Sequence, residues 1–396
     1  MDANKEGGSR LPAAEALPPV AWAEIDLNAL AANMRALAMR IGSVAEIMPA
    51  VKANAYGHGA VRVAETLLAN GASMLAVARL SEAAELRDAG ITAPILMLGN
   101  CLSEHVKLTA DMNVWASVNS FEEARVLASE AQDRGVTLRC HIKIDTGMGR
   151  LGIIADGLPA VGNRAAIEQV RDICELKGLA VDGIFTHLAA ADSADKSSAK
   201  AQVARFANLV QQTDEAKLNI KWRHAANSAA CIDMPDACFN LVRPGIAVYG
   251  LAPSHDIDIA ALGLAPVMSL KTKIIGIKHV EAGYSVSYGG TFTTKRPSII
   301  AAVAIGYGDG YSRSFSNRGF MLAGGRRVPV AGRVCMDLTM LDVTDAPHVA
   351  VGDEVVVFGK QADEIISADE LADMIGTINY EITTGVAARV RRVCLV

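Results

Sequence analysis

The feature that most constrains the fold is a regular alternation of short apolar runs with amphipathic stretches between residues 21 and 252. A stretch such as SFEEARVLASEAQ (120–132) has helical spacing, whereas each apolar run has the length of a strand. Strands that alternate with helices are typical of parallel sheets, and eight such runs predict a (β/α)8 barrel. The runs lie at residues 46–52, 74–80, 94–99, 113–118, 137–145, 181–188 and 219–225, and the eighth begins at residue 240.

The alternation ends at the segment APSHDIDIAALG (252–263), which brings a proline, aspartates and a glycine. Beyond it, β-branched runs separated by Gly or Asp turns predict an all-β domain with one helical patch, ADELADMIG (368–376). A chain of 396 residues also exceeds the size at which a single core keeps growing. We therefore expect an α/β protein with a disordered tail at 1–20, a (β/α)8 barrel at 21–255 and a mainly β domain at 256–396.

Charge and cysteine content restrict the class of partner. The 38 basic and 43 acidic residues give a formal net charge of −5 without a long basic run, which argues against binding to nucleic acid or anionic membranes. The seven cysteines form no CxxC pair and argue against a disulfide framework. The first twenty residues contain no apolar core of a signal peptide. These features predict a soluble, cytoplasmic protein with reduced thiols and a small-molecule partner.

The segment VKANAYGHG (51–59) places a lysine and a tyrosine on a glycine-rich turn directly after the first apolar run. A surface lysine is almost fully protonated at pH 7, but one at a strand end can lose water and stay neutral. Only the neutral amine condenses with an aldehyde, so Lys52 is a candidate covalent catalyst. For a lone lysine, the alternative of a solvated side chain on an ordinary loop is favoured by roughly ten to one.

Polar residues also follow the later runs, at the strand ends where barrel enzymes build their sites. The HAANSAA segment (224–230) and the RPGI segment (243–246) would lie side by side and could hold a phosphate through loop amides and a short helix. Taken alone, Ser228 is more often an N-cap, and a histidine at a strand end is more often a satisfied core residue. The candidates at strand ends are Arg150, His187, Asn227, Ser228, Arg243, Gly245 and Ile246.

Several motifs together resemble the alanine racemase family, whose members use pyridoxal 5′-phosphate (PLP). The resemblance extends over about residues 21–396. It implies a PLP-dependent racemase that interconverts L-alanine and D-alanine, and no metal site. The motifs are VKANAYGHG, KIDTGMGRLG, HAANSAA with VRPGIAVYG, VSYG, IGYGDG and CMD.

The resemblance assigns residues to the cofactor one by one. It implies that Lys52 carries the cofactor and that the phenolic oxygen of the cofactor meets Arg150, which also contacts substrate. The residue that matches Lys143 is often carbamylated in the family, and a carbamate there would orient Arg150. The implied phosphate ligands are Tyr56, Ser228, Gly245, Ile246 and Tyr380, with Asn227 beside them.

Racemisation needs a proton acceptor on one face of the substrate and a donor on the other. The resemblance implies that Lys52 and Tyr288, in VSYGGTF, are these two bases, with His187 bridging Tyr288 and Arg243. Arg243 would face the pyridine nitrogen of the cofactor, where a guanidinium disfavours protonation and weakens the electron sink. A weaker sink confines the reaction to proton exchange at Cα and suppresses transamination.

Tyr307 in IGYGDG and Met336 in CMD lie on glycine-flanked turns of the β domain. By resemblance they close the active-site entrance and bind the substrate carboxylate in the barrel of the other subunit. The functional unit would then be a homodimer with shared sites.

Two other enzyme activities and one binding function compete with alanine racemisation. A racemase of broader specificity, acting on serine, lysine or other amino acids, would fit the same motifs. A PLP-dependent amino-acid decarboxylase of the same architecture has no need of a base at Tyr288. A non-catalytic PLP-binding protein is disfavoured by residues 259–396, because its single-barrel relatives have no second domain.

Overall fold

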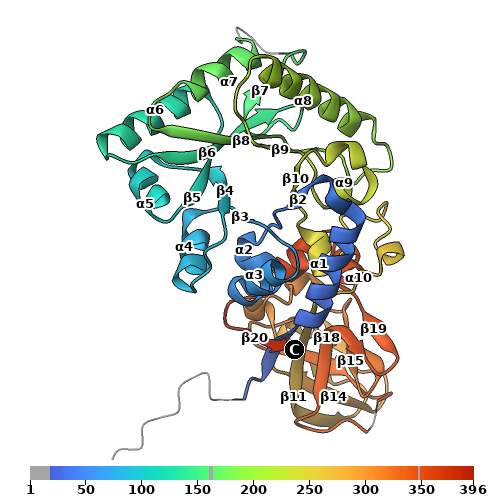
Figure 1. Cartoon of the computed structure of the whole chain (residues 1–396). Coiled ribbons are helices and arrows are strands. Elements are labelled where there is room, and N and C mark those ends of the chain that lie inside the picture. The colour runs from blue at the N-terminus through green and yellow to red at the C-terminus, as the bar shows by residue number, and fades with distance from the viewer. Residues whose placement is uncertain (1–17, 160–163, 347) are drawn as a thin grey trace, which may run out of the picture. The chain divides into compact units, whose positions relative to one another are not determined.

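The structure is a computed structural model that describes residues 18–159, 164–346 and 348–396 (Figure 1). The described residues form two compact units. The barrel unit contains residues 25–268, 377–385 and 394–396, and the β unit contains residues 269–376 and 386–393 with the described residues up to 24. The tail predicted at 1–20 lies outside the described residues as far as position 17.

Eight strands form the barrel itself. They are β2 (Glu46–Ile47), β3 (Leu75–Val77), β4 (Ile95–Asn100), β5 (Val114–Val118), β6 (Leu138–Asp145), β8 (Leu179–Phe185), β9 (Trp222–His224) and β10 (Leu241–Val242). Strands β3, β4, β5, β6, β8 and β9 pair in that order, all in parallel, and β10 pairs in parallel with β2. A parallel bridge between Ala50 and Ala76 joins β2 to β3. Just after β9 and β10, a backbone hydrogen bond from Arg243 N to Ala226 O, 2.9 Å long, joins these two strands.

These connections close the eight strands into one ring, so the predicted (β/α)8 barrel is confirmed. Each predicted apolar run contains or overlaps one strand. All residues of β3 and β5 are buried, as expected for strands that are covered on both faces. A short strand that the sequence did not predict, β7 (Ile153–Ile154), pairs with β6.

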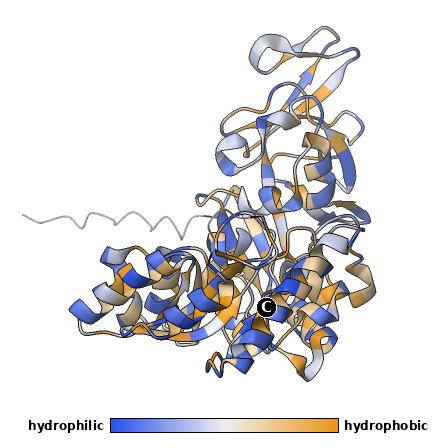
Figure 2. Ribbon diagram, turned by 90° about the horizontal axis from the view of Figure 1, so that it is seen from above, coloured by the Kyte–Doolittle hydropathy of each residue, from blue (hydrophilic) through white to orange (hydrophobic). Residues whose placement is uncertain are grey.

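The described part of the barrel unit also contains ten α-helices. They are α1 (Leu27–Ile41), α2 (Lys52–Tyr56), α3 (Ala60–Ala69), α4 (Leu80–Asp88), α5 (Val106–Asp111), α6 (Phe121–Asp133), α7 (Ala166–Cys174), α8 (Ser197–Glu215), α9 (Ser228–Asp233) and α11 (Asn379–Thr384). The buried residues of α6, Ala124, Leu127, Ala128 and Ala131, recur at the spacing of one helix face. Hydrophobic and hydrophilic positions accordingly alternate along the helices (Figure 2). Ser120 caps α6 by accepting from Glu123 N at 3.1 Å, so the predicted helix at 120–132 is confirmed.

The β unit contains an antiparallel sheet. The strands of this sheet are β1 (Ala21–Asp26), β11 (Met268–Val280), β14 (Ser298–Val303), β15 (Phe320–Ala323), β16 (Arg326–Pro329), β17 (Thr339–Asp342), β18 (Glu354–Gln361), β19 (Glu364–Ile366) and β20 (Arg391–Leu395). The order is β16-β15-β18-β11-β1-β20, with β14 and β17 attached through β11 and β19 through β18. Strands β12 (Ser285–Val286) and β13 (Phe292–Thr293) form a separate two-stranded sheet. A small core forms around Val286, Ile300 and Ala331. The β-rich character predicted for this region is therefore confirmed.

The one helix predicted in this region is α10 (Ala368–Ile375). Ser367 caps it by accepting from Glu370 N at 3.0 Å, and Gly376 ends it with a left-handed φ of 73°.

All seven cysteines lie among the described residues and are free thiols, as the sequence predicts. In the part of the chain that the structure describes, no helix is both long and apolar enough to cross a membrane.

Candidate active site

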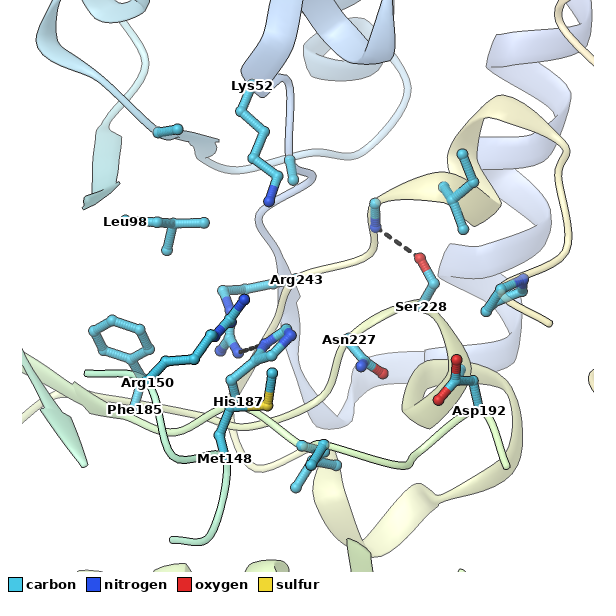
Figure 3. A pocket seen from close by; sticks show the side chains of 18 of the residues that line it. Lys52, Leu98, Met148, Arg150, Phe185, His187, Asp192, Asn227, Ser228 and Arg243 are labelled. Atoms are coloured by element: carbon cyan, nitrogen blue, oxygen red, sulfur yellow. Dashed lines mark hydrogen bonds between the residues drawn. The ribbon is translucent and has the colours of Figure 1, made fainter. Parts of the chain in front are cut away.

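A cavity of about 470 Å³ lies at the carboxyl ends of the barrel strands (Figure 3). Every residue that lines it belongs to the barrel unit. The structure brings together here all eleven barrel-unit residues that the sequence singled out. They are Lys52, Tyr56, Lys143, Arg150, His187, Asn227, Ser228, Arg243, Gly245, Ile246 and Tyr380.

The turn that carries Lys52 is left-handed. Ala53, Asn54, Ala55 and Tyr56 all have a φ of 53°, although none is glycine. Ala55 N bonds to Val51 O at 2.8 Å and Gly57 N to Ala53 O at 2.9 Å, as in one turn of helix. The left-handed conformation costs an L-residue about 1–2 kcal/mol, so this turn stores strain directly beside the candidate nucleophile. The sequence predicted a glycine-rich turn but carried no signal for four left-handed non-glycine residues.

Tertiary contacts support this turn. Asn54 Oδ1 accepts from Ala60 N at 2.7 Å, at the start of α3. Gly57 approaches Thr383 of α11 so closely that a Cβ on Gly57 would lie 2.1 Å from Thr383 O. Only glycine fits at position 57, where φ is 86° and the backbone of another helix is in contact.

Lys52 points into the cavity among other cations (Figure 3). Burial lowers the pKa of Lys52, the positive charges of Arg150 and Arg243 lower it further, and the carboxylate of Glu82 opposes them. A lower pKa increases the fraction of neutral amine near pH 7, which is the form that attacks an aldehyde.

Burial also acts on the neighbouring groups. Burial and the charge of Arg150 lower the pKa of Lys143 to about 8. Burial and the charge of Arg243 hold the pKa of His187 well below its usual range, so His187 is neutral at pH 7. The cavity also contains the carboxylate of Asp192, but four basic side chains line it, which suits the cavity to an anionic ligand. They are Lys52, Lys143, Arg150 and Arg243.

Arg243 is 5% exposed and is held by neutral acceptors. It donates to Thr186 O at 2.7 Å, to Ala225 O at 3.2 Å and to His224 Nδ1 at 2.5 Å. A terminal nitrogen of Arg243 lies 3.5 Å from His187 Nδ1. The two residues that the sequence linked are therefore neighbours. None of these contacts involves a carboxylate, and Arg243 lines the cavity (Figure 3).

His224 and His141 extend this network, and the sequence analysis did not single them out. His224 Nδ1 must accept from Arg243, so its Nε2 carries the proton and donates to His141 Nδ1 at 2.8 Å. Burial holds the pKa of His224 well below its usual range, which keeps this neutral tautomer. His224 begins the HAANSAA segment, so its position directly before the predicted phosphate loop was the available signal.

The predicted phosphate residues meet on one side of the cavity. Ser228 Oγ accepts from Gly245 N at 2.8 Å and from Ala247 N at 3.2 Å, and joins α9 to the loop after β10. Asn227 caps α9 by accepting from Ala230 N at 3.1 Å. A Cβ on Gly245 would lie 2.5 Å from Tyr56 Oη, so glycine at 245 leaves room for that hydroxyl.

Tyr56 lies within an aromatic cluster. Its ring centroid is 5.0 Å from that of Tyr249 and 6.0 Å from that of Tyr380. Burial raises the pKa of Tyr56 to about 12, so its hydroxyl stays protonated and can donate to an anion. Tyr380 reaches this cluster because α11, far along the chain, belongs to the barrel unit.

The loop that carries Arg150 is organised by Asp145, another residue that the sequence analysis did not single out. Asp145 Oδ1 accepts from the backbone N–H groups of Gly147, Met148 and Gly149 at 2.8–3.1 Å. This carboxylate fixes the turn after β6 and thereby the direction in which Arg150 leaves it.

Tyr288, Tyr307 and Met336 belong to the β unit, where their side chains are 70%, 43% and 54% exposed. Their loops are neighbours. Tyr307 N donates to Cys335 O at 3.0 Å and Gly308 N to Met336 O at 2.8 Å. Ser287 Oγ donates to Arg333 O at 2.6 Å. The structure therefore gathers these three candidates on adjoining loops of one unit.

Arg389 holds two of these loops together, and the sequence analysis did not single it out. Its Nε donates to Asp309 Oδ1 at 2.7 Å and a terminal nitrogen donates to Asp337 Oδ1 at 2.8 Å. Asp309 Oδ2 in turn accepts from Gly306 N at 2.9 Å. These bonds connect the turn of Tyr307 to the turn of Met336.

Among the residues that the structure describes, no cluster of three or more His, Cys, Asp or Glu side chains could hold a metal ion.

The fold and the site define a barrel enzyme with a desolvated lysine in a cationic cavity. The sequence model of the alanine racemase N-terminal domain matches residues 25–253, and that of the C-terminal domain matches residues 267–394. The chain belongs to the alanine racemase family and is therefore an enzyme of the isomerase class.

Individual relatives agree with this assignment. The chain is 49% identical to an alanine racemase of Desulfosudis oleivorans over 375 residues, which cover 94% of this chain and 96% of the relative. A solved alanine racemase of Clostridium difficile 630 has a TM-score of 0.89 at 37% identity and covers 95% of this chain and 96% of its own. A Bacillus anthracis alanine racemase solved with bound L-Ala-P has a TM-score of 0.88 at 38% identity, with 96% of each chain covered.

Proposed function

We propose that this chain is a PLP-dependent racemase that interconverts L-alanine and D-alanine. The observation that carries the proposal is a lysine of lowered pKa that begins a strained turn and points into a cationic cavity, in a chain of the alanine racemase family. Relatives named alanine racemases match it over nearly their full length.

The residues of the cavity fit PLP. An aldehyde requires a neutral amine, which Lys52 would supply. A phosphate dianion requires donors, which Tyr56, Tyr380, Ser228 and the amide of Ile246 would supply beside Asn227 and Gly245. Arg150 would contact the phenolic oxygen and Arg243 the pyridine nitrogen. When bound, the cofactor stabilises negative charge at the substrate Cα.

We propose that Lys52 and Tyr288 are the two bases. Lys52 would hold or accept the Cα proton on one face, and Tyr288 would do so on the opposite face, with His187 between Tyr288 and Arg243. Tyr307 and Met336 would bind the substrate carboxylate. Since Tyr288 is 70% exposed in the β unit of its own chain, we propose that it acts in the barrel of a second copy.

Several further assignments belong to the same proposal. Residues 21–255, with Tyr380 of the barrel unit, would act as the cofactor-binding domain. The rest of residues 256–396 would complete the site of the partner subunit, in a cytoplasmic homodimer. Lys143 would carry a carbamate, because its pKa of about 8 leaves a neutral amine available to carbon dioxide at moderate pH. The carbamate would then orient Arg150.

The proposal is tested by incubating L-alanine with the enzyme and PLP in deuterated water. Inverted product with deuterium at Cα is expected, because proton return from either base exchanges with solvent. Release of carbon dioxide without inversion would instead identify a decarboxylase. Initial rates with serine, lysine and alanine would separate an alanine-specific racemase from one of broader specificity.

Gly245→Ala is expected to weaken PLP binding by about fivefold to 150-fold, because overpacking a tight site costs about 1–3 kcal/mol. The new Cβ would meet Tyr56 Oη, which the neighbouring aromatic rings prevent from moving away. PLP binding is followed by absorbance titration. Gly276→Ala is the control, since a Cβ at Gly276 meets nothing within 4 Å. Equal PLP affinities for the two variants would contradict the phosphate assignment.

Arg389→Met is expected to lower kcat/KM for alanine by about tenfold to 100-fold, chiefly through a higher KM, because Tyr307 and Met336 lose their common support. PLP affinity should stay unchanged. Arg296→Met removes an exposed ion pair with Asp345 in the same unit and serves as the control. Steady-state kinetics that are the same for both variants would exclude this role for Arg389.

A further inference from the structure

Glu82 makes an unusual set of contacts beside the turn of Lys52. It is the third residue of α4, and its Oε2 accepts from Ala78 N at 2.7 Å and from Arg79 N at 3.0 Å, both in the loop before that helix. Its Oε1 reaches across to Ala53 N at 2.7 Å. One carboxylate thus connects the loop after β3 to the residue that directly follows Lys52.

The bond to Ala53 meets a need of the turn. The first N–H groups of any helical turn have no partner within it, and the left-handed conformation of residues 53–56 is disfavoured for L-residues. The turn therefore depends on bonds from outside, and Glu82 supplies one at its first left-handed residue.

The charge of Glu82 also matters for Lys52. The groups that act on Lys52 are Arg150 and Arg243, which disfavour its protonation, and Glu82, which favours it. Lys143, His187 and Asp192 line the same cavity, where the unmodified amine of Lys143 adds positive charge and Asp192 contributes a second carboxylate. Glu82 is the one carboxylate among the groups that act on Lys52 in the described part of the chain.

We propose that Glu82 is a positioning residue for Lys52, which holds the left-handed turn through Ala53 and counters the cations of the cavity. The proposal rests on the proposed function, in which Lys52 is the reactive lysine. Glu82 is not expected to touch cofactor or substrate.

Glu123 offers a matched control within the same barrel. It is likewise the third residue of its helix, α6, and its carboxylate accepts from Asn119 N at 2.7 Å. Its other acceptor bond is to the side chain of the same residue, Asn119 Nδ2, at 3.1 Å. Glu123→Gln therefore perturbs an equivalent helix start without affecting the turn of Lys52.

The first experiment measures the reactivity of Lys52 in the full chain after PLP has been removed. An amine-specific acylating reagent is applied across a pH series, and the Lys52 peptide is quantified by mass spectrometry. Glu82→Gln should shift the apparent pKa of Lys52 to lower pH, because the anion that favours the ammonium form is lost. Glu123→Gln should leave the profile unchanged.

The second experiment measures reconstitution with PLP by absorbance. Glu82→Gln should weaken PLP binding about three- to tenfold, the effect of losing one partly exposed hydrogen bond to a charged group. Glu82→Asp keeps the charge but is too short to bridge both loops. It should weaken PLP binding and leave the apparent pKa of Lys52 in the labelling experiment unchanged. If circular dichroism shows that Glu82→Gln does not fold, Glu82→Asp provides the test.

The proposal would be overturned if Glu82→Gln left both the labelling profile and PLP binding unchanged. Equal changes in Glu82→Gln and Glu123→Gln would also overturn it. The labelling experiment requires no turnover. A chain that failed to racemise alanine would therefore disprove the proposed function, whereas the labelling profiles would still decide the role of Glu82.

Discussion

Lys52→Ala is expected to abolish both covalent attachment of PLP and racemisation. Lys52 is the lysine of lowered pKa at the start of the strained turn, and the variant removes the amine that we propose to condense with the cofactor aldehyde. The same amine is the proposed base on one face of the substrate. Losing an acid–base group alone costs about 10²–10⁴-fold, and attachment of the cofactor is lost as well, so kcat should fall by about 10⁴-fold. The visible absorbance of the lysine-bound cofactor and the rate of change of optical rotation measure the two effects.

Borohydride reduction supplies a direct test of the same lysine. In the wild-type enzyme, reduction should fix the cofactor on the peptide that contains Lys52. Lys107→Ala is a suitable control, because Lys107 pairs with Asp111 on the surface of the same unit. Retained turnover in Lys52→Ala, or a label on another peptide, would remove Lys52 from the centre of the proposal.

Tyr288→Phe is expected to lower racemisation by about 10²–10⁴-fold while PLP still binds and still absorbs. The change removes one oxygen, and Tyr288 is exposed in its own chain, so folding should be unaffected. Proton exchange at Cα should continue on the face served by Lys52. Exchange measured for L-alanine and D-alanine separately should therefore become unequal.

Mixing inactive Lys52→Ala and Tyr288→Phe subunits should restore activity if each site takes its lysine from one chain and its tyrosine from the other. A mixed dimer then contains one intact site, and random exchange of equal amounts should return about a quarter of wild-type activity. The measurement is the racemisation rate after subunit exchange has been verified by mass-tagged chains.

A matched mixture controls for nonspecific reactivation. Lys52→Ala combined with the double variant Lys52→Ala, Tyr288→Phe contains no intact lysine and should stay inactive at every ratio. Absence of activity in the first mixture, after exchange has been demonstrated, would place Tyr288 in the same chain as the lysine that it serves.

The strands of the barrel could be predicted because they are local features of the sequence. Each strand is a short, continuous run of apolar residues, because both of its faces are buried. The polar residues at the ends of these runs, among them Lys52, Arg150 and Arg243, could be grouped because parallel strands bring their carboxyl ends to the same edge. The cavity that these residues line agrees with that reasoning.

Other parts of the site depended on resemblance rather than on pattern. Tyr56 and Tyr380 are separated by more than three hundred positions, and nothing in the composition of INYE links it to the first barrel strand. The structure brings them within 6.0 Å, because α11 belongs to the barrel unit and packs beside Gly57. Such a contact is a property of the tertiary fold, which periodicity does not contain.

The sequence by itself determined the barrel and the β-rich region after it, since hydrophobic spacing and residue type express these directly. Only the tertiary structure decided the left-handed turn of residues 53–56, the tautomers of His224 and His141, and the reach of Glu82 to Ala53. The physical reason is that a disfavoured backbone and a fixed proton position persist only when distant groups bond to them. Those partners lie far away in sequence and become neighbours only when the chain folds.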